Sequence, residues 1–276
     1  MSFPARWVHG APDCAANSQE RIQVHPLDRD TWILRQDKCS DPPASHEGSF
    51  MYLLLGEERA LLIDTGASGS AARFPIGTAV RDLLRRRAAE RGGRQLPLVA
   101  CHSHGHGDHV AGDALVRAAT GALIVEPGMA ALAAAFRSRP TTAGILPLEL
   151  GDRTILALAI PGHERDHVAL YDRRNRLLFT GDTLYPGVLT VQDWPAFRRS
   201  VRRLAQLVEQ EPVDFVLGSH VEAKNRPHQF YAPRTPARRR LDMNVISVCT
   251  GSAMRRTMTW AEAVRSTVSS ETRPVR

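Results

Sequence analysis

A dense group of metal-ligand residues lies between positions 102 and 109. His104, His106, Asp108 and His109 follow one another with two glycines between them. Glycine lets the backbone bend, so neighbouring side chains can turn toward one point. Imidazole nitrogen and carboxylate oxygen suit zinc, and they also suit iron and manganese. The tract therefore predicts a metal site.

Three later residues strengthen this prediction. His163, Asp182 and His220 each stand just after a predicted strand, as the histidine tract does. Strands that lie side by side in a layered α/β protein place their ends along one edge, where such folds usually carry their chemistry. We therefore expect the tract and these three residues to converge, although each of the three alone would be read as a turn residue.

The remaining sequence supplies the elements that would position these side chains. Strands are predicted from apolar runs and helices from helical spacing. The predicted strands span 31–35, 50–55, 60–63, 96–100, 122–126, 147–150, 154–160, 168–172, 177–180 and 213–217, and the helices span 78–91, 110–120, 129–136 and 195–210. We divide the chain into an irregular arm (1–20), one α/β domain (21–230) and an irregular, basic, Ser/Thr-rich tail (231–276).

Five short motifs occur in the order typical of one protein family: Leu62-Ile63-Asp64-Thr65-Gly66, His104-Gly-His106-Gly-Asp108-His109, Pro161-Gly162-His163, Phe179-Thr180-Gly181-Asp182-Thr183-Leu184 and Gly218-Ser219-His220. Over residues 21–221 the chain resembles the metallo-β-lactamase superfamily of metal-dependent hydrolases. The resemblance implies an αββα sandwich, in which two β-sheets pack face to face between helices and carry the metals at one edge.

The resemblance also implies a ligand set. His104, His106 and His163 would hold one divalent ion, Asp108, His109 and His220 a second, and Asp182 would bridge them. Zinc is favoured, and iron or manganese would also fit. A hydroxide shared by the two ions, oriented by Asp108, would cleave an ester, thioester or lactone bond in a small molecule.

Other candidate residues receive weaker assignments. Asp64 is expected to support the site without binding metal, and His102 to be a supporting or merely exposed imidazole. His9, His25, His46 and His228 are expected at the surface. Residues beside the ligands either shape a pocket or are ordinary loop residues: Glu164, Arg165, Asp166 and Tyr185.

The branch of the family is indicated by Asp182. Its setting in Thr-Gly-Asp-Thr-Leu resembles glyoxalase II and its relatives, whereas true β-lactamases carry other residues at that position. Two features depart from glyoxalase II. Residues 164–167 read Glu-Arg-Asp-His, where the family more often has threonine and then Gly-Ser or Gly-His. The chain near and beyond His220 also lacks the tyrosine pattern and the helical substrate domain of that enzyme.

Two other functions stay open. A phosphodiesterase or ribonuclease of the same superfamily is suggested by the net charge of +7. However, no nucleic-acid-binding insertion is visible, and the arginines within 81–91 and 198–203 lie on predicted helices, where charge is more often solvated. A mononuclear iron oxygenase would need only one of the two ligand sets. Nucleic acid is therefore disfavoured as a partner, and the oligomeric state is left open.

The cellular setting is inferred from what the sequence lacks. Cys14, Cys39, Cys101 and Cys249 show no paired spacing that predicts a disulfide. No signal peptide is visible, and no run approaches the roughly 18 apolar residues of a membrane span. We therefore expect a cytoplasmic protein without a membrane partner.

Overall fold

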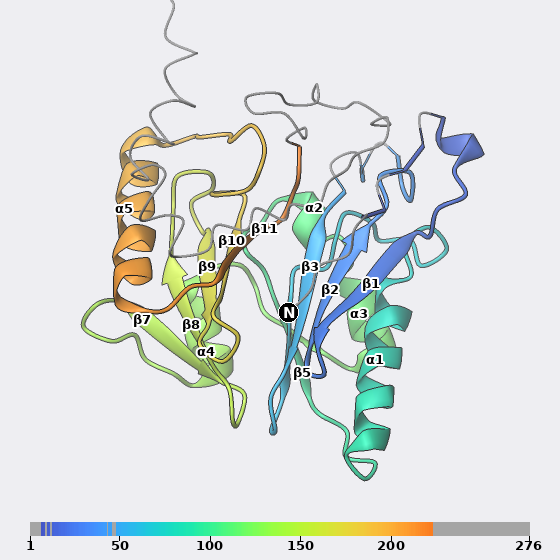
Figure 1. Cartoon of the computed structure of the whole chain (residues 1–276), viewed down its shortest axis with the longest axis horizontal. Helices are drawn as coiled ribbons and strands as arrows, with labels where there is room; N and C mark the ends of the chain where they lie inside the picture. The colour runs from blue at the N-terminus through green and yellow to red at the C-terminus, as the bar shows by residue number, and fades with distance from the viewer. Residues whose placement is uncertain (1–6, 9, 12, 43, 46–47, 223–276) are drawn as a thin grey trace, which may run out of the picture.

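A computed structural model of the chain describes residues 7–8, 10–11, 13–42, 44–45 and 48–222. Its strands form two β-sheets, one of six strands and one of five, which lie face to face with helices on the outside (Figure 1). The predicted αββα sandwich is confirmed. The residues predicted for the tail from 231 onward, including Cys249, lie outside the described part.

The first sheet has the strand order β1-β2-β3-β4-β5-β6. Its first four strands are antiparallel, whereas β4, β5 and β6 run parallel to one another. Strand bounds are β1 Ile22–Asp28, β2 Thr31–Gln36, β3 Phe50–Leu55, β4 Ala60–Ile63, β5 Leu98–Cys101 and β6 Leu123–Ile124.

The second sheet has the order β11-β10-β9-β8-β7, and only β10 and β11 run parallel. Its strands are β7 Ile145–Glu149, β8 Thr154–Ala159, β9 Val168–Asp172, β10 Leu177–Gly181 and β11 Phe215–Gly218. The helices are α1 Ile76–Glu90, α2 Gly107–Val110, α3 Asp113–Thr120, α4 Met129–Phe136 and α5 Trp194–Gln210. In Figure 1, α1 lies outside the first sheet and α5 outside the second.

Both faces of each sheet are covered by apolar side chains. In β3, Phe50, Tyr52 and Leu54 face the core between the sheets, whereas Met51, Leu53 and Leu55 pack with residues of α1. A third cluster joins α5 to the second sheet. Burial on both faces explains why β3 reads as a continuous apolar run instead of an alternating one.

Most elements lie where the sequence predicts them, with two differences. Strand β1 was not predicted: it is an edge strand that contains Pro26 and carries half-exposed polar residues, so its pattern is weak. The predicted helix 110–120 is divided into α2 and α3 around Gly112. A Cβ at Gly112 would lie 2.2 Å from the Thr65 carbonyl oxygen, so the close approach of these two segments requires glycine.

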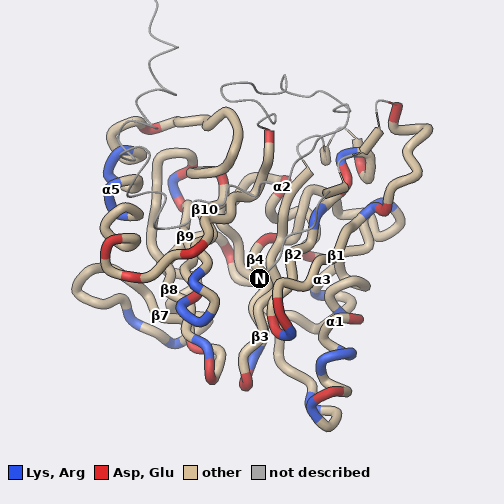
Figure 2. The backbone as a smooth tube through the Cα atoms, viewed as in Figure 1, with Lys and Arg blue, Asp and Glu red and all other residues tan. Residues whose placement is uncertain are grey.

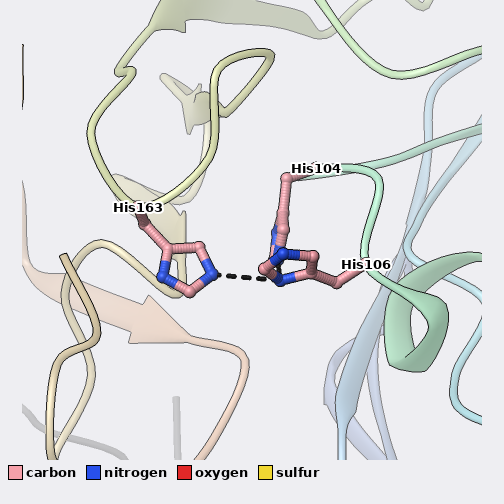
Figure 3. Close-up of side chains that lie close together, drawn as sticks. All are labelled: His104, His106 and His163. Carbon is pink, nitrogen blue, oxygen red and sulfur yellow. Dashed lines mark hydrogen bonds between the residues drawn. The ribbon is translucent and has the colours of Figure 1, made fainter. Parts of the chain in front are cut away.

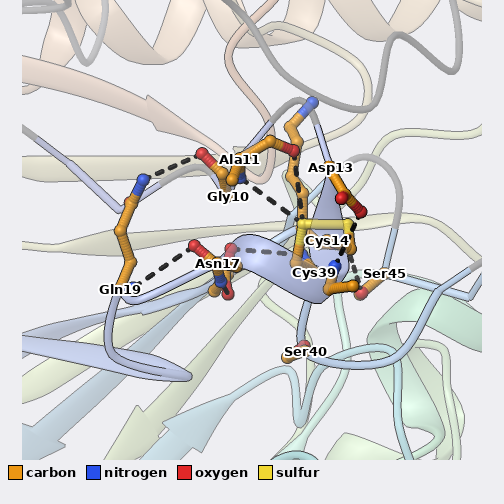
Figure 4. Close-up of a disulfide and its surroundings, with 12 residues drawn as sticks. Gly10, Ala11, Asp13, Cys14, Asn17, Gln19, Cys39, Ser40 and Ser45 are labelled. Atoms are coloured by element: carbon orange, nitrogen blue, oxygen red, sulfur yellow. Dashed lines mark hydrogen bonds between the residues drawn. A yellow bond between two sulfur atoms is a disulfide. The ribbon is translucent and has the colours of Figure 1, made fainter.

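The cysteine prediction is wrong. Cys14 and Cys39, 25 residues apart, form a disulfide that joins the short 3-10 turn η1 (Cys14–Ala16) to the loop after β2 (Figure 4). Trp7 is also buried, edge-on against Phe50. The described part of the arm contains η1 and is fastened to the domain. Cys101 is free and buried.

Charged residues of both signs are interspersed over the described part of the chain (Figure 2). Residues 223–276 hold eleven of the 36 Lys and Arg but three of the 29 Asp and Glu, so the positive excess resides there. Arg87 on α1 is buried against Asp30, which corrects the expectation of a solvated arginine face at this position. Among the described residues, no helix is long and apolar enough to cross a bilayer.

Candidate metal centre

The candidate ligands gather at one edge of the two sheets. The histidine tract follows β5, His163 follows β8, Asp182 follows β10 and His220 follows β11. Because β10 and β11 are parallel, and β8 runs in the same direction as β10, the carboxyl ends of these strands share an edge. Helix α2 begins within the tract and carries Asp108 and His109.

His104, His106 and His163 form a three-histidine group, in which the rings point toward one another (Figure 3). The Nδ1 atom of His106 lies 2.9 Å from Nε2 of His104 and 3.2 Å from Nε2 of His163. Nitrogens around a tetrahedral zinc at 2.0–2.1 Å would be about 3.3 Å apart. The spacing of these three nitrogens fits such an ion.

Asp108, His109 and His220 form a second, mixed group. Oδ2 of Asp108 lies 3.3 Å from Nε2 of His109 and 3.2 Å from Nε2 of His220. Both histidines are almost completely buried. A carboxylate and two imidazoles at this spacing are a donor set that divalent metals accept.

Asp182 stands between the two groups. Its Oδ2 atom faces the three-histidine group, at 3.9 Å from Nε2 of His104 and 3.6 Å from Nε2 of His163. Its Oδ1 atom faces the mixed group, at 3.6 Å from Nε2 of His109 and 3.4 Å from Nε2 of His220. The two carboxylate oxygens of Asp182 therefore face different histidine nitrogens, one oxygen for each group.

Buried polar atoms in this centre lack hydrogen-bond partners within the described protein. They are Oδ2 of Asp108, Nε2 of His109 and Oδ1 of Asp182. Buried polar groups are normally satisfied, and leaving one unpaired costs about 1–3 kcal/mol. Atoms of ligand type that face one another without hydrogen-bond geometry fit metal ions placed between them.

The electrostatics of the centre favour bound positive charge. Burial alone would raise the pKa of Asp108 and of Asp182, but the neighbouring imidazoles of His109 and His220 hold both well below the usual range. Burial lowers the pKa of His220, yet Asp182 and Asp108 outweigh it and raise the value to about 10. Burial, aided by nearby imidazoles, lowers the pKa of His104 far below normal. The carboxylates thus stay charged and attract protons or cations.

The ring nitrogens that face away from the candidate ions are also held. Nδ1 of His109 donates to Asp64 Oδ2 at 2.9 Å, and Nδ1 of His163 donates to the Thr190 carbonyl at 2.8 Å. The Ser103 hydroxyl donates to Asp64 Oδ2 at 2.9 Å, and Nδ1 of His104 lies 3.1 Å from the same hydroxyl. These bonds leave the Nε2 lone pairs of the three histidines directed into the centre. Asp64 supports the site as expected.

His167 was missed as a site residue. It is fully buried, its ring stacks on that of His104 with centroids 4.6 Å apart, and its Nδ1 lies 3.2 Å from the Thr183 hydroxyl. Burial lowers its pKa to about 3. A Cβ at Gly181 would come within 2.3 Å of its Nε2, so the ring fills the space that glycine leaves. The spacing of His163 and His167 was the available signal.

Of the remaining predicted residues, some lie beside a candidate ligand and others do not. Glu164 lies 3.3 Å from His106, and the Tyr185 ring lies 5.5 Å from that of His220, whereas Arg165 and Asp166 are exposed. His102 is buried 3.3 Å from Asp113, so its reading as an exposed imidazole is wrong. His25 is half-buried against Trp7; His9, His46 and His228 lie outside the described residues.

Comparisons with known proteins agree with this geometry. The chain is 28% identical over 204 residues to the acyl-coenzyme A thioesterase MBLAC2 of Bos taurus, covering 62% of this chain and 72% of that protein. It is 35% identical over 136 residues to the hydroxyacylglutathione hydrolase of Cereibacter sphaeroides, covering 47% of this chain and about half (49%) of that protein.

A solved metallo-beta-lactamase from Pontibacter korlensis shares the fold. It superposes with a TM-score of 0.50 at 20% identity and covers 72% of this chain and 91% of that one. The model of the metallo-beta-lactamase superfamily matches residues 46–220, which include all seven candidate ligands. Together with the sandwich and the edge that gathers these ligands, the match shows that the chain belongs to the metallo-beta-lactamase superfamily and is a hydrolase of that fold.

Proposed function

We propose that the chain hydrolyses small-molecule thioesters with two divalent metal ions, most simply zinc. His104, His106 and His163 would hold one ion, Asp108, His109 and His220 the other, and Asp182 would contact both. The observation that carries this proposal is the placement of Asp182, whose two oxygens face the two groups separately.

When bound, such ions would lower the pKa of a bound water toward neutrality and polarise a carbonyl oxygen. The protein's own residues would set the geometry of attack. Asp182 fixes the separation of the two groups because its carboxylate is buried between them. Asp108 is the more exposed carboxylate, with 22% of its side chain accessible against 8% for Asp182, so it is the one placed to orient an entering nucleophile.

The thioester class is supported by two relatives. One is named as a thioesterase of acyl-coenzyme A and the other as a hydrolase of hydroxyacylglutathione, and both substrates join an acyl group to a thiol. Their shared chemistry is an activated carbonyl with a thiolate leaving group. A centre with two positive ions suits this reaction because negative charge develops on both the carbonyl oxygen and the sulfur.

The test combines metal analysis with a substrate panel. Purified full-length protein is analysed for zinc, iron and manganese, then assayed with an acyl thioester, an oxygen ester, a lactone and a phosphodiester. We expect close to two divalent ions per chain and fastest turnover of the thioester. A single iron per chain without hydrolysis would replace the proposal with the oxygenase alternative, and preferred phosphodiester turnover would replace it with the nuclease alternative.

The compartment stays a separate prediction. A cytoplasmic setting was expected partly because no disulfide was predicted, and the Cys14–Cys39 bond argues against a reducing environment. Counting free thiols by mass spectrometry, on protein taken rapidly from its native cells, decides between a reducing and an oxidising compartment. Two fewer free thiols than after reduction would place the chain in an oxidising compartment.

A further inference from the structure

One candidate ligand differs from the others in how it is held. His104, His109 and His163 are buried, and each has a partner for the ring nitrogen that faces away from the centre: Ser103, Asp64 and the Thr190 carbonyl. By contrast, the side chain of His106 is 40% exposed. Packing therefore restrains this ring least.

His106 also meets the centre through its other nitrogen. Its Nδ1 atom faces His104 and His163, so Nε2 points away. The Oε2 atom of Glu164 lies 3.3 Å from this Nε2. Glu164 thus faces the outward nitrogen of His106, as Asp64 faces that of His109, although only Asp64 accepts a hydrogen bond, at 2.9 Å.

The carboxylate of Glu164 is itself fixed from two directions. The backbone N–H of Arg165 donates to Oε1 at 2.9 Å, and the side-chain amide of Gln192 donates to Oε2 at 3.3 Å. Gln192 is anchored in turn, since its backbone N–H donates to the Gly162 carbonyl at 2.8 Å. A side chain held by neighbours on both sides can hold a third group in place.

We infer that Glu164 is a positioning residue, which fixes the ring of His106 and makes its Nδ1 a stronger ligand through the charge that its carboxylate places beside Nε2. This inference rests on the proposed function, because it assumes an ion in the three-histidine group. Partners of this kind set the tautomer and basicity of a metal-binding histidine, and losing one typically lowers metal affinity about 10- to 100-fold.

The test measures zinc affinity in the full-length protein by competition with a chelating dye. In Glu164→Ala we expect one of two zinc ions to bind about 10- to 100-fold more weakly, and this is the ion that His106→Ala loses. The other ion keeps its affinity. Glu164→Gln recovers part of the loss, because its amide oxygen keeps a partial negative charge beside Nε2 of His106 while its NH₂ group opposes the Arg165 N–H.

The matched control is Asp166→Ala, which removes an exposed carboxylate two residues away and should bind both ions as the wild type does. Wild-type affinity in Glu164→Ala, or an equal loss in Asp166→Ala, overturns the inference. Should Glu164→Ala fail to fold, Gln192→Leu removes one of the donors that hold Glu164 and should weaken the same ion by a smaller factor. Unchanged affinity in that variant overturns the inference as well.

The outcome is separable from that of the proposed function. A wild type that binds two zinc ions but hydrolyses no thioester contradicts the proposed substrate and leaves the Glu164 comparison decisive. A wild type that binds no divalent ion overturns both.

Discussion

The two ends of the β-strands bury charge in opposite ways. At the end opposite the metal centre lies an ion-pair cluster, in which Arg153 pairs with Asp172, with both side chains fully buried, and Asp30 accepts from Arg87, Arg91 and Arg174. Arg153 also donates to the carbonyls of Asp30 and Leu55. At the metal-centre end, ligand atoms of Asp108, His109 and Asp182 are buried without hydrogen bonds.

The difference separates a structural role from a functional one. In the ion-pair cluster each carboxylate meets guanidinium groups, so the chain satisfies its own buried charge and joins the two sheets. The metal centre concentrates carboxylates and imidazoles, and ligand atoms of Asp108, His109 and Asp182 face one another there without hydrogen bonds. Because unpaired buried groups destabilise a fold, their concentration at one edge indicates that a ligand completes them.

The largest effect is expected from substitutions in the candidate metal centre. Asp182→Asn keeps the shape of the side chain but removes the charge shared by the two groups. Thioester hydrolysis should fall roughly 10³-fold, which corresponds to the several kcal/mol that metal-ion catalysis supplies, and bound metal should fall with it. Steady-state kinetics and elemental analysis measure both, and His106→Ala should behave alike. Full activity in either variant would contradict the two-metal centre.

Substitutions in the ion-pair cluster should lower the free energy of unfolding and leave metal binding unchanged. Arg153→Met leaves Asp172 buried without its guanidinium partner, which should cost about 3–5 kcal/mol. Urea unfolding measures this loss. The double variant Arg153→Met/Asp172→Leu should recover part of it, since an apolar pair replaces the buried ions. Metal content per folded chain should stay at the wild-type value; a parallel loss of metal would show that the two ends are not independent.

A smaller effect is expected in the pH dependence of folding. Burial would raise the pKa of Asp30, but hydrogen bonds and charge from Arg87, together with Arg91 and Arg174, hold it below the ordinary value. The stabilisation is therefore present above the unfolded pKa of about 3.9 and is lost as pH falls through the lower folded pKa. Urea unfolding of chelator-treated protein should show that the free energy of unfolding falls less at acid pH in Asp30→Asn than in the wild type. Equal falls in the variant and the wild type would contradict this prediction.

The smallest effect is expected from the basic tail. Truncation after residue 240 removes five arginines and three acidic residues but no candidate ligand, since the last of these is His220. Metal content and the melting temperature with and without chelator should match those of the full chain. A truncated protein that folds but loses metal would show that the tail supports the centre.

The fold could be predicted largely because buried strands leave a strong local signal. The apolar runs of β3, β4, β9 and β10 coincide with the structure to within a residue. Strand β1 was not predicted, because an edge strand that contains Pro26 needs neither a strong alternation of apolar and polar residues nor full burial. The break between α2 and α3 was not predicted, because it depends on a contact with a distant segment. Thr65, which approaches Gly112, lies 47 positions earlier in the chain.

Candidate ligands could be predicted for a similar reason. Glycine-flanked histidines and aspartates at strand ends are visible without coordinates, and all seven lie at one edge. The residues that hold them are less visible. His167 stacks on His104 and Glu164 lies beside His106. In the sequence the only signal for His167 is its spacing from His163, and Glu164 stays open between a pocket residue and an ordinary loop residue.

By itself, the sequence determined which residues could bind metal, the order of strands and helices, and the family, because these depend on local composition and on motif spacing. Only the tertiary structure decided which oxygen of Asp182 faces which group, that Cys14 meets Cys39, and that Arg87 is buried against Asp30. These are contacts between segments distant in the chain. They are set by how the two sheets and their loops pack, for which a single sequence carries no local signal.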